Sequence, residues 1–454
     1  MAQPETAGKQ STKQKISIIL ALAIPAMVEN TLQMVVGFVD TLFVARLGLN
    51  EVTAVGIANA VLAVYIAIFM AIGVGTSSLI ARSIGSGDIE KAKSIARQST
   101  FISILAGMIF GIISVFFSEP LLKMMGAESD VLRDGSIYLQ IVGIPSVFIS
   151  LMFNFGSILR AAGDTKTPMK VSWWINLIHI GLDYVLIFGL FKLDGFGVAG
   201  AAWATVIVRL LGSAALYHHI KKSPVSFSFS GESSKGDSFA ILTLSAPAAI
   251  ERLIMRLGQV VYFGLIVKIG AETYAAHTIA GNIETFSYMP GYGLAIAATT
   301  LVGQRIGARQ YREAYEFGFL TTGLAIGFMS LIGLVLFFLS PWFASWFTTD
   351  LHARGMVVTA LKIDAFAQPA LAVGLVLAGA LQGAGDTKSP MYSTALGMWV
   401  IRIIGVYIFG ILFGMGIAGI WISIAIDLYA RGAFLFYQFK KHFKKIEEKN
   451  LGVN

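Results

Sequence analysis

Polar side chains at helical spacing interrupt the first long apolar stretch of the chain. Glu29, Gln33 and Asp40 lie in the apolar segment 16–45, separated by four and seven residues, so in a helix they share one face. A charged side chain at the centre of a membrane-spanning helix costs about 2.5–3.5 kcal/mol on insertion scales, so it needs a functional reason. Pro25 stands just before this face and predicts a bend there, because proline removes a backbone hydrogen bond from the helix.

A second polar face falls in the apolar segment 169–191, where Asn176, His179 and Asp183 follow one another at spacings of three and four residues. Surroundings of low dielectric favour the neutral form of a carboxylic acid, and such a group can exchange a proton near neutral pH. We therefore interpret Asp40 and Asp183 as a proton-binding or cation-binding pair, with Asn176 as a neutral hydrogen-bond partner. The alternatives are an ion pair for Asp183 and a packing role for His179.

Methionine and aromatic side chains accompany these polar faces. Methionine adapts to apolar shapes of many kinds, and aromatic rings attract organic cations. Together with one glutamine they form our set of candidates for a substrate cleft, which comprises Met34, Gln33, Met169, Met255, Met289, Phe286 and Tyr288. Contact with lipid or with a neighbouring helix explains any one of them equally well. The arginines inside apolar segments, such as Arg209 and Arg402, receive no role at this stage, since snorkelling or pairing accounts for them.

The composition identifies the elements that must hold these groups as membrane-spanning helices. Apolar residues make up 56% of the 454-residue chain and charged residues only 13%, which is far too little charge for the surface of a water-soluble protein of this length. The chain has no cysteine, which excludes disulfides and thiolate metal sites. The first fifteen residues are polar and show no small-residue cleavage site, so the first apolar segment is predicted to be a retained helix with a cytoplasmic tail.

Twelve windows are long and apolar enough to cross a bilayer, which takes about 20 residues each. They are 16–45, 52–81, 98–117, 135–159, 169–191, 197–218, 240–267, 275–303, 317–340, 356–381, 392–413 and 416–438. The loops around 82–97, 160–170, 221–235 and 305–312 each carry three or more Lys or Arg residues, and so does the C-terminal tail, whereas the opposite loops carry only one or two. This asymmetry predicts that both termini are cytoplasmic and explains the net charge of +8 without a nucleic-acid partner.

The two halves of the chain repeat one another. Pro25 matches Pro247 and Glu29 matches Glu251, each 222 residues later, and LRAAGDTKTPM at 159–169 returns as LQGAGDTKSPM at 381–391. Asp40 matches Tyr262, so only the first half has this carboxylate. Six spans in each half give the halves the same orientation, related by a pseudo-twofold axis along the membrane normal, an arrangement typical of secondary transporters that bind substrate between the lobes.

The predicted organisation follows from the repeat and its seam. We expect a cytoplasmic N-terminal tail (1–15), an N-terminal lobe of helices 1–6 (16–220), a Ser-rich cytoplasmic linker (221–238), a C-terminal lobe of helices 7–12 (239–438) and a basic cytoplasmic tail (439–454). The fold class is thus an all-α integral membrane protein with twelve transmembrane helices in two homologous six-helix lobes. Neither HExxH, nor GxSxG, nor an ATP-binding P-loop occurs, so we expect no enzyme.

Several motifs together resemble the multidrug and toxin extrusion (MATE) transporters, and most of all their bacterial DinF branch. They are the opening IPAMVENTLQMVVGFVDTLFVARLG, the loops RAAGDTKTP and GAGDTKSP, the pair LDYVLIFG and GVAGAAWAT, and the start of the second half, APAAIERLIMRLGQ. The resemblance covers essentially the whole chain. It implies two six-helix lobes around a central cleft and export of amphipathic, often cationic compounds against an inward flow of H+ or Na+.

The resemblance also implies which residues couple transport to the ion. In the N-terminal lobe the matching positions are Asp40, Asp183, Asn154 and Thr205. In the C-terminal lobe Glu251 and Asp364 match the cation-site acids of other branches. Many relatives have Asn four residues before the fifth-helix Asp, where this chain has His179. This departure argues against a sodium site in the N-terminal lobe and favours proton coupling through Asp40.

The sequence and the resemblance together predict a proton-coupled antiporter. Protonation of Asp40 would neutralise the pocket and release a bound organic cation, and deprotonation would prepare the pocket for the next one. We expect a monomer in the bacterial plasma membrane, with lipid and small organic molecules as its partners and no cofactor other than the coupling ion. Na+ coupling and a flippase for lipid-linked glycans remain the alternatives, the latter requiring a cleft rich in Arg and Lys.

Overall fold

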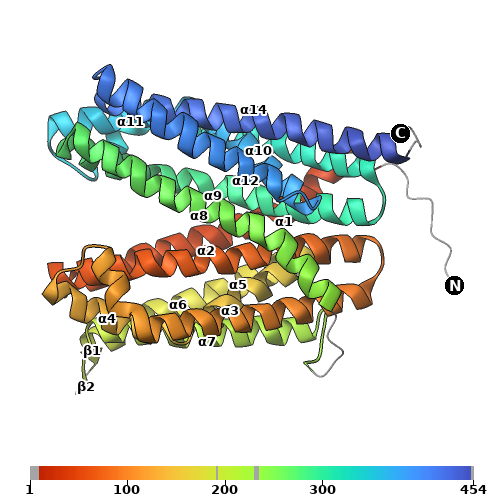
Figure 1. The fold of residues 1–454 in the computed structure, drawn as a ribbon, viewed down its shortest axis with the longest axis horizontal. Helices are drawn as coiled ribbons and strands as arrows, with labels where there is room; N and C mark the ends of the chain where they lie inside the picture. The colour runs from red at the N-terminus through yellow and green to blue at the C-terminus, as the bar shows by residue number, and fades with distance from the viewer. Residues whose placement is uncertain (1–9, 191–192, 230–234, 451–454) are drawn as a thin grey trace. The chain divides into compact units, whose positions relative to one another are not determined.

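The computed structural model describes residues 10–190, 193–229 and 235–450, and almost all of them are α-helical (Figure 1). Residues 1–9, 230–234 and 451–454 lie outside the described residues, so the predicted tails and linker are described only in part. The described part of the linker is short and irregular between α7 and α8. In contrast, the basic segment after residue 438 continues the last helix through Asn450.

The helices of the first half are α1 (Thr12–Ala45), α2 (Leu49–Gly85), α3 (Ile89–Met124), α4 (Ser129–Gly143), α5 (Ser146–Ala161), α6 (Lys166–Phe188) and α7 (Val198–Lys221). Those of the second half are α8 (Lys235–Ile269), α9 (Ala271–Gly307), α10 (Tyr311–Ser345), α11 (Leu351–Gly383), α12 (Lys388–Ala395), α13 (Ile403–Gly405) and α14 (Gly416–Asn450), with π-helical turns η1 (Leu396–Arg402) and η2 (Val406–Leu412). Two short antiparallel strands, β1 (Gly189–Leu190) and β2 (Leu193–Asp194), join α6 to α7.

Each of the twelve predicted windows is mainly helical, although the window 135–159 is interrupted at 144–145 and the window 169–191 runs past the end of α6 into β1. Ten helical segments are long and apolar enough to cross a membrane, and the bent pair formed by α4 and α5 brings the number to eleven among the described residues. The one remaining window, 275–303, corresponds to α9, which has 37 residues but does not meet the same criterion of length and composition. Polar residues such as Glu284 and Tyr288 interrupt its apolar sequence, so the reason for the shortfall is the polar cluster described below.

The fourth span is broken rather than straight. Its two helical pieces meet at an angle of 51° around Pro145, which stands directly before α5. Proline cannot donate a backbone hydrogen bond, so it fits at the start of a new helix without loss, whereas inside a helix it removes one bond. The hydroxyl of Ser146 donates a 2.5 Å hydrogen bond to the Gly143 carbonyl and so satisfies an acceptor that the break exposes.

The described chain forms two compact units. The first unit comprises Val28–Leu257 and Gly385–Met391. The second unit comprises the described residues up to Met27, Gly258–Ala384 and the residues from Tyr392 onward. Both α1 and α8 are divided between the units, α1 two residues after Pro25. The lobe boundaries that the repeat suggests stay a prediction.

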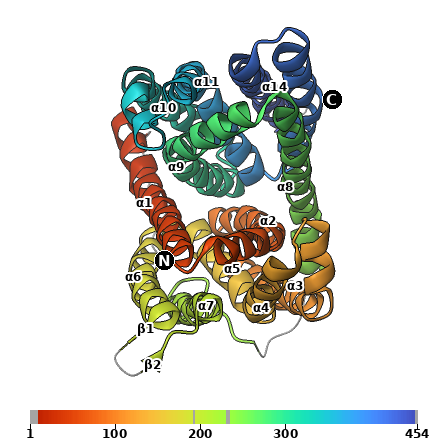
Figure 2. The same ribbon diagram turned by 90° about the vertical axis from the view of Figure 1, so that its left-hand side faces the viewer.

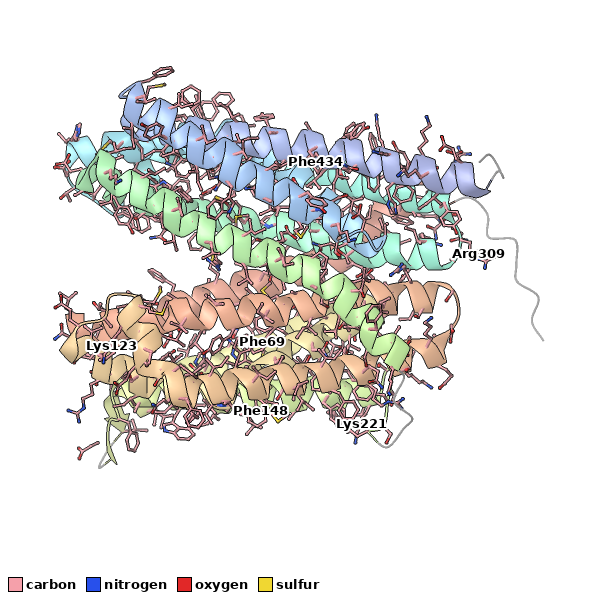
Figure 3. All side chains as sticks on the ribbon, viewed as in Figure 1. Phe69, Lys123, Phe148, Lys221, Arg309 and Phe434 are labelled. Carbon is pink, nitrogen blue, oxygen red and sulfur yellow. The ribbon has the colours of Figure 1, made fainter. Side chains whose placement is uncertain are left out.

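Within the first unit, α2, α3 and α5 contact one another, and α7 contacts both α5 and α6 (Figure 2). Its core includes Phe69, which is fully buried (Figure 3). In the second unit, α9, α10 and α11 contact one another and α14 packs on α11. Charged residues such as Lys123, Lys221 and Arg309 lie at helix ends (Figure 3), as expected for helices that cross a membrane.

The repeated GDTK loop ends one helix and starts the next. Gly163 and Gly385 have φ values of 91° and 87°, a left-handed conformation that glycine adopts without steric cost. One residue later, the Asp164 carboxylate accepts a 2.9 Å hydrogen bond from the Thr167 N–H, and Asp386 accepts one of 2.9 Å from the Ser389 N–H. The motif that reveals the internal repeat is therefore explained by helix capping.

Candidate functional site

The predicted polar face of α6 is buried and contacts α7. Asp183 is fully buried, and its Oδ2 lies 3.5 Å from His179 Nε2, one turn earlier on the same helix. The same nitrogen meets α7, since Thr205 Oγ1 lies 3.4 Å from His179 Nε2. Thr205 also donates a 3.1 Å hydrogen bond to the Ala201 carbonyl. His179 Nε2 thus lies near both of the predicted residues Asp183 and Thr205, whereas the sequence left a packing role open for this histidine.

Asp40 of α1 belongs to the same cluster. It is buried and lies within electrostatic range of Asp183. Tyr138 of α4 is also buried and interacts electrostatically with Asp40, Asp183 and the guanidinium of Arg209 from α7. We call Asp40, Tyr138, His179, Asp183, Thr205 and Arg209 the N-terminal polar cluster. All six fall in one compact unit, brought together from α1, α4, α6 and α7.

The carboxylates of the N-terminal polar cluster are short of hydrogen-bond donors. Neither oxygen of Asp183, nor Oδ1 of Asp40, has a hydrogen-bond partner among the described residues. A buried, unpartnered carboxylate is costly, so such a group either keeps a proton or binds a cation. Arg209 supplies one positive charge to the cluster, where it interacts electrostatically with Tyr138 and His179. With two carboxyl groups and one guanidinium, the cluster can accept one further, exchangeable positive charge.

The two predicted asparagines lie in different surroundings. Asn154 of α5 is fully buried, and its amide donates a 3.1 Å hydrogen bond to Ser99 Oγ of α3, whereas its Oδ1 has no partner among the described residues. Asn176 is half-buried on the α6 face that carries His179 and Asp183, and no described group accepts a hydrogen bond from its Nδ2. Asn176 thus extends the polar face of α6 beyond His179 and Asp183. The side chain of Asn154 is instead hydrogen-bonded to α3.

A second buried polar group lies in the other compact unit. Glu284 of α9 and Asp364 of α11 lie within hydrogen-bond range of each other through their carboxyl groups. Tyr288 donates a 2.8 Å hydrogen bond to Glu284 Oε1, and Gln368 Nε2 donates one of 2.6 Å to Asp364 Oδ2. We call these four residues the carboxyl pair site. Two carboxyl groups at hydrogen-bond distance cannot both be ionised at low cost, so they share a proton or hold a cation.

Two arginines contact one buried aspartate, and one of them, Arg402, lies near the carboxyl pair site. Arg402, the last residue of η1, contacts Asp427 Oδ2 through both Nε and Nη2 at 2.8 Å. Arg431 Nε donates a 2.6 Å hydrogen bond to Asp427 Oδ1. The Arg402 guanidinium also lies 5.8 Å from the centre of the Tyr262 ring and within electrostatic range of Glu284. π-helical turns often mark functional sites, and here one ends at a charged residue beside the carboxyl pair.

The structure pairs Asp364 with Glu284, not with the second predicted acid, Glu251. Glu251 falls in the other compact unit, on the first part of α8. The sequence does show that Glu284 and Asp364 are both acids inside predicted spans. Their spacing in the sequence, however, does not indicate that they contact each other. The same holds for Tyr138 and Arg209, which the sequence left without a role. Across the described ranges, no three His, Asp or Glu side chains come together as they would around a metal ion.

The predicted substrate-cleft residues divide between the units. Met34, Gln33, Met169 and Met255 fall in one, and Met289, Phe286 and Tyr288 in the other. All are half-buried except Phe286, which is 53% exposed. Tyr288 is part of the carboxyl pair site through its bond to Glu284. The structure therefore gives Tyr288 a specific polar partner, and the cleft role of the whole set stays a prediction.

Comparison with known proteins identifies the family. The sequence model of the MatE family matches the chain twice, over residues 25–185 and 247–408. The two matches begin 222 residues apart, at the offset of the internal repeat, so the predicted duplication is confirmed. The chain is 31% identical to the probable multidrug resistance protein NorM of Thermotoga maritima over 91% of its own length and 89% of that protein. It is 30% identical to the uncharacterized transporter YisQ of Bacillus subtilis, with 96% of both chains covered.

The fold agrees with a solved structure of a multidrug resistance MATE family transporter in an outward-facing conformation. The TM-score is 0.90 at 24% identity, and the alignment covers 96% of this chain and 97% of the other. At that level of identity the agreement concerns the fold alone. The predicted fold class, an all-α membrane protein made of two homologous halves, is confirmed, as is the expectation of a transporter rather than an enzyme. The chain belongs to the MatE family of membrane transporters.

Proposed function

We propose that the protein exports amphipathic, often cationic organic compounds from the bacterial cytoplasm by antiport with a cation, H+ by preference. The family and the names of its relatives support multidrug export in general. The observation that carries the finer proposal is the pair Asp40 and Asp183, buried within electrostatic range of each other and short of hydrogen-bond donors. A buried negative charge inside a transporter attracts either a proton or an organic cation.

The charge balance of the N-terminal polar cluster supports exchange of one charge per cycle. The cluster contains one guanidinium, that of Arg209, and two carboxyl groups, those of Asp40 and Asp183, so a proton or the substrate supplies the remaining positive charge. Proton and substrate then compete for the same charge, which makes their coupling reciprocal. Exchange of one proton for one monovalent cation moves no net charge across the membrane, so the membrane potential by itself would not drive it.

The proposed conformational step involves α1. Proline at position 25 weakens this helix, and the division of α1 between the two compact units follows two residues later. Asp40 is on the part of α1 beyond that division. A change in the charge of Asp40 therefore acts on a helix that proline has weakened. This fits alternating access, in which one group of helices moves against the other.

A specific observation favours a second coupling site in the other half. Glu284 and Asp364 share a proton-binding geometry with donors from Tyr288 and Gln368. Carboxylate, phenol and amide oxygens are also hard ligands of the kind that Na+ prefers. If Na+ drives export, we place its site at the carboxyl pair rather than at Asp40.

The remaining expectations belong to the same proposal. We propose that the protein works as a monomer in the cytoplasmic membrane with both termini in the cytoplasm. A flippase for lipid-linked glycans is the alternative, and it would need unpaired basic groups for a pyrophosphate. In the described part of the chain, Arg402 and Arg431 both already contact Asp427, so neither offers an unpaired guanidinium for that use.

Dye efflux tests the proposal. Cells carrying wild type or Asp40→Asn are loaded with ethidium, and the imposed gradient is switched between H+ and Na+. We expect H+-driven efflux in wild type and its loss in the variant. Na+-driven efflux that survives Asp40→Asn but not Asp364→Asn would transfer the coupling to the carboxyl pair site. Absence of efflux under both gradients, with the protein folded in the membrane, would contradict drug export and favour the flippase.

A further inference from the structure

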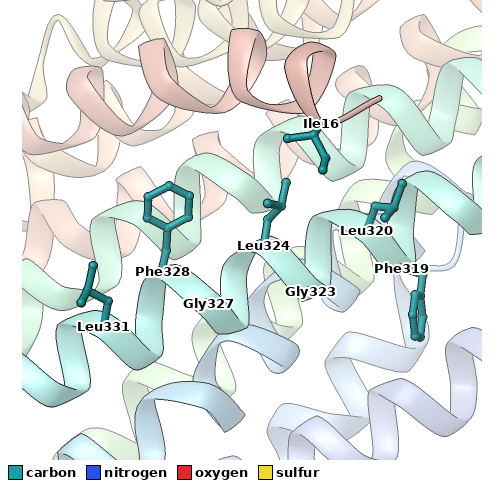
Figure 4. A pocket seen from close by; sticks show the side chains of 8 residues that line it. All are labelled: Ile16, Phe319, Leu320, Gly323, Leu324, Gly327, Phe328 and Leu331. Atoms are coloured by element: carbon teal, nitrogen blue, oxygen red, sulfur yellow. The ribbon is translucent and has the colours of Figure 1, made fainter. Parts of the chain in front are cut away.

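One face of α10 carries an apolar groove that lies outside the residues assigned to the proposed export function. It is lined by Ile16 of α1 and seven residues of α10, and it has a volume of about 480 Å³ (Figure 4). Gly323 and Gly327 form its floor, one turn apart, and a Cβ added to either would meet no atom within 4 Å. Phe319 and Leu331, at opposite ends of the groove, are 51% and 60% exposed. The shape and chemistry fit a hydrocarbon chain.

One end of this groove is positively charged. Arg312 and Glu316 continue the stripe of α10 that runs through the two glycines, because these positions recur every three or four residues. Glu316 forms ion pairs with Arg312, at 3.3 Å, and with the buried Lys15 of α1. Lys13 is exposed and lies one turn before Ile16 on the same helix. Lys15 and Arg312 contact the Glu316 carboxylate, and with Lys13 these side chains carry a surplus of two positive charges.

We propose that the groove binds one anionic phospholipid, with an acyl chain along Gly323 and Gly327 and the phosphate near Lys13 and Arg312. Basic groups at the end of an apolar groove between membrane helices match a lipid of this kind in both charge and shape. A second copy of the chain is the rival occupant, since two glycines four residues apart also let membrane helices approach closely. A symmetric contact of that kind would bring the positive ends of two grooves together, and like charges oppose it.

Native mass spectrometry of the purified, partly delipidated full-length protein tests this proposal with phosphatidylglycerol and phosphatidylcholine as probes. We expect wild type to retain one phosphatidylglycerol in preference to phosphatidylcholine by about tenfold. Lys13→Gln with Arg312→Gln should remove the preference without abolishing lipid binding. Gly327→Leu should fill the groove and reduce retention of both lipids.

Two controls separate a specific site from general effects. Lys166→Gln with Lys170→Gln removes the same charge from exposed side chains elsewhere, and Gly264→Leu adds the same volume at another exposed glycine with open space around it. Both should retain lipid as wild type does. Equal retention of the two lipids by wild type, or an unchanged preference after the Lys13 and Arg312 substitutions, would refute the proposal even if Gly327→Leu fails to fold. Dimers in wild type that Gly327→Leu dissociates would assign the groove to a second copy instead.

Discussion

The carboxyl groups of Glu284 and Asp364, from α9 and α11, lie within hydrogen-bond range of each other in the buried interior of one compact unit. Their separation of 80 residues hides this relationship in the sequence. Tyr288 and Gln368 each donate a hydrogen bond to one member of the pair, so both carboxyl groups are held in place from their own helices.

If Na+ can drive export, we predict that substitutions in the carboxyl pair reduce Na+-driven efflux more than H+-driven efflux. Asp364→Asn removes a ligand charge but keeps the shape of the side chain, and we expect Na+-driven efflux to fall about tenfold while H+-driven efflux changes by less than about twofold. Glu284→Gln should have the same effect, because the two groups act as one site. Dye efflux from proteoliposomes under each gradient measures both. Loss of H+-driven efflux in these variants alone would relocate the proton site to this pair.

The N-terminal polar cluster gives a prediction about net charge movement. If Arg209 compensates one carboxylate, a single proton exchanges for a monovalent dye, and an imposed membrane potential should leave the wild-type rate within about twofold. Asp40→Asn should abolish exchange, and Asp183→Asn should reduce it at least about tenfold. Proteoliposomes with a potassium diffusion potential provide the measurement. A strong acceleration by an inside-negative or inside-positive potential would mean that both carboxylates titrate.

Asp427 should matter for stability more than any exposed acid. It is fully buried between Arg402 and Arg431, so Asp427→Asn leaves two buried cations without their counterion. Removing one partner of a buried ion pair costs about 3–5 kcal/mol. Glu313→Gln is the matched control, because its pair with Arg305 at 3.2 Å is partly exposed and should contribute about 0–1 kcal/mol. Thermal unfolding in detergent compares the two variants, and equal shifts would contradict this reading of Asp427.

Capping by the repeated loop is testable in the same way. Asp386 accepts hydrogen bonds from both the N–H and the hydroxyl of Ser389, at 2.9 and 2.6 Å. Asp386→Ala should therefore destabilise the protein by about 0.5–2 kcal/mol, whereas Asp386→Asn should retain most of the capping. Thermal unfolding distinguishes these outcomes. If the alanine variant is as stable as wild type but transports poorly, the loop has a functional role that capping does not explain.

The sequence alone predicted the spans for a physical reason, while the repeat came from matching residues in its two halves and the family from the resemblance of its motifs. The bilayer requires long apolar helices, and these leave a periodic signature in the chain. It also predicted Asp40 and Asp183 as a pair, because an acid inside an apolar helix is too costly to be incidental. The polar residues that lower the hydropathy of α9 were visible as well, although their partner on α11 was not.

Contacts between distant helices were decided only by the tertiary structure. His179 became a bridge between Asp183 and Thr205, and Arg209 and Tyr138 became members of the same cluster. The structure places Asp364 next to Glu284, whereas Glu251 lies in the other compact unit. Periodicity fixes which side chains share a face of one helix, but which faces of two helices meet depends on packing. A pairing between residues far apart in the chain therefore leaves no trace in the spacing of a single sequence.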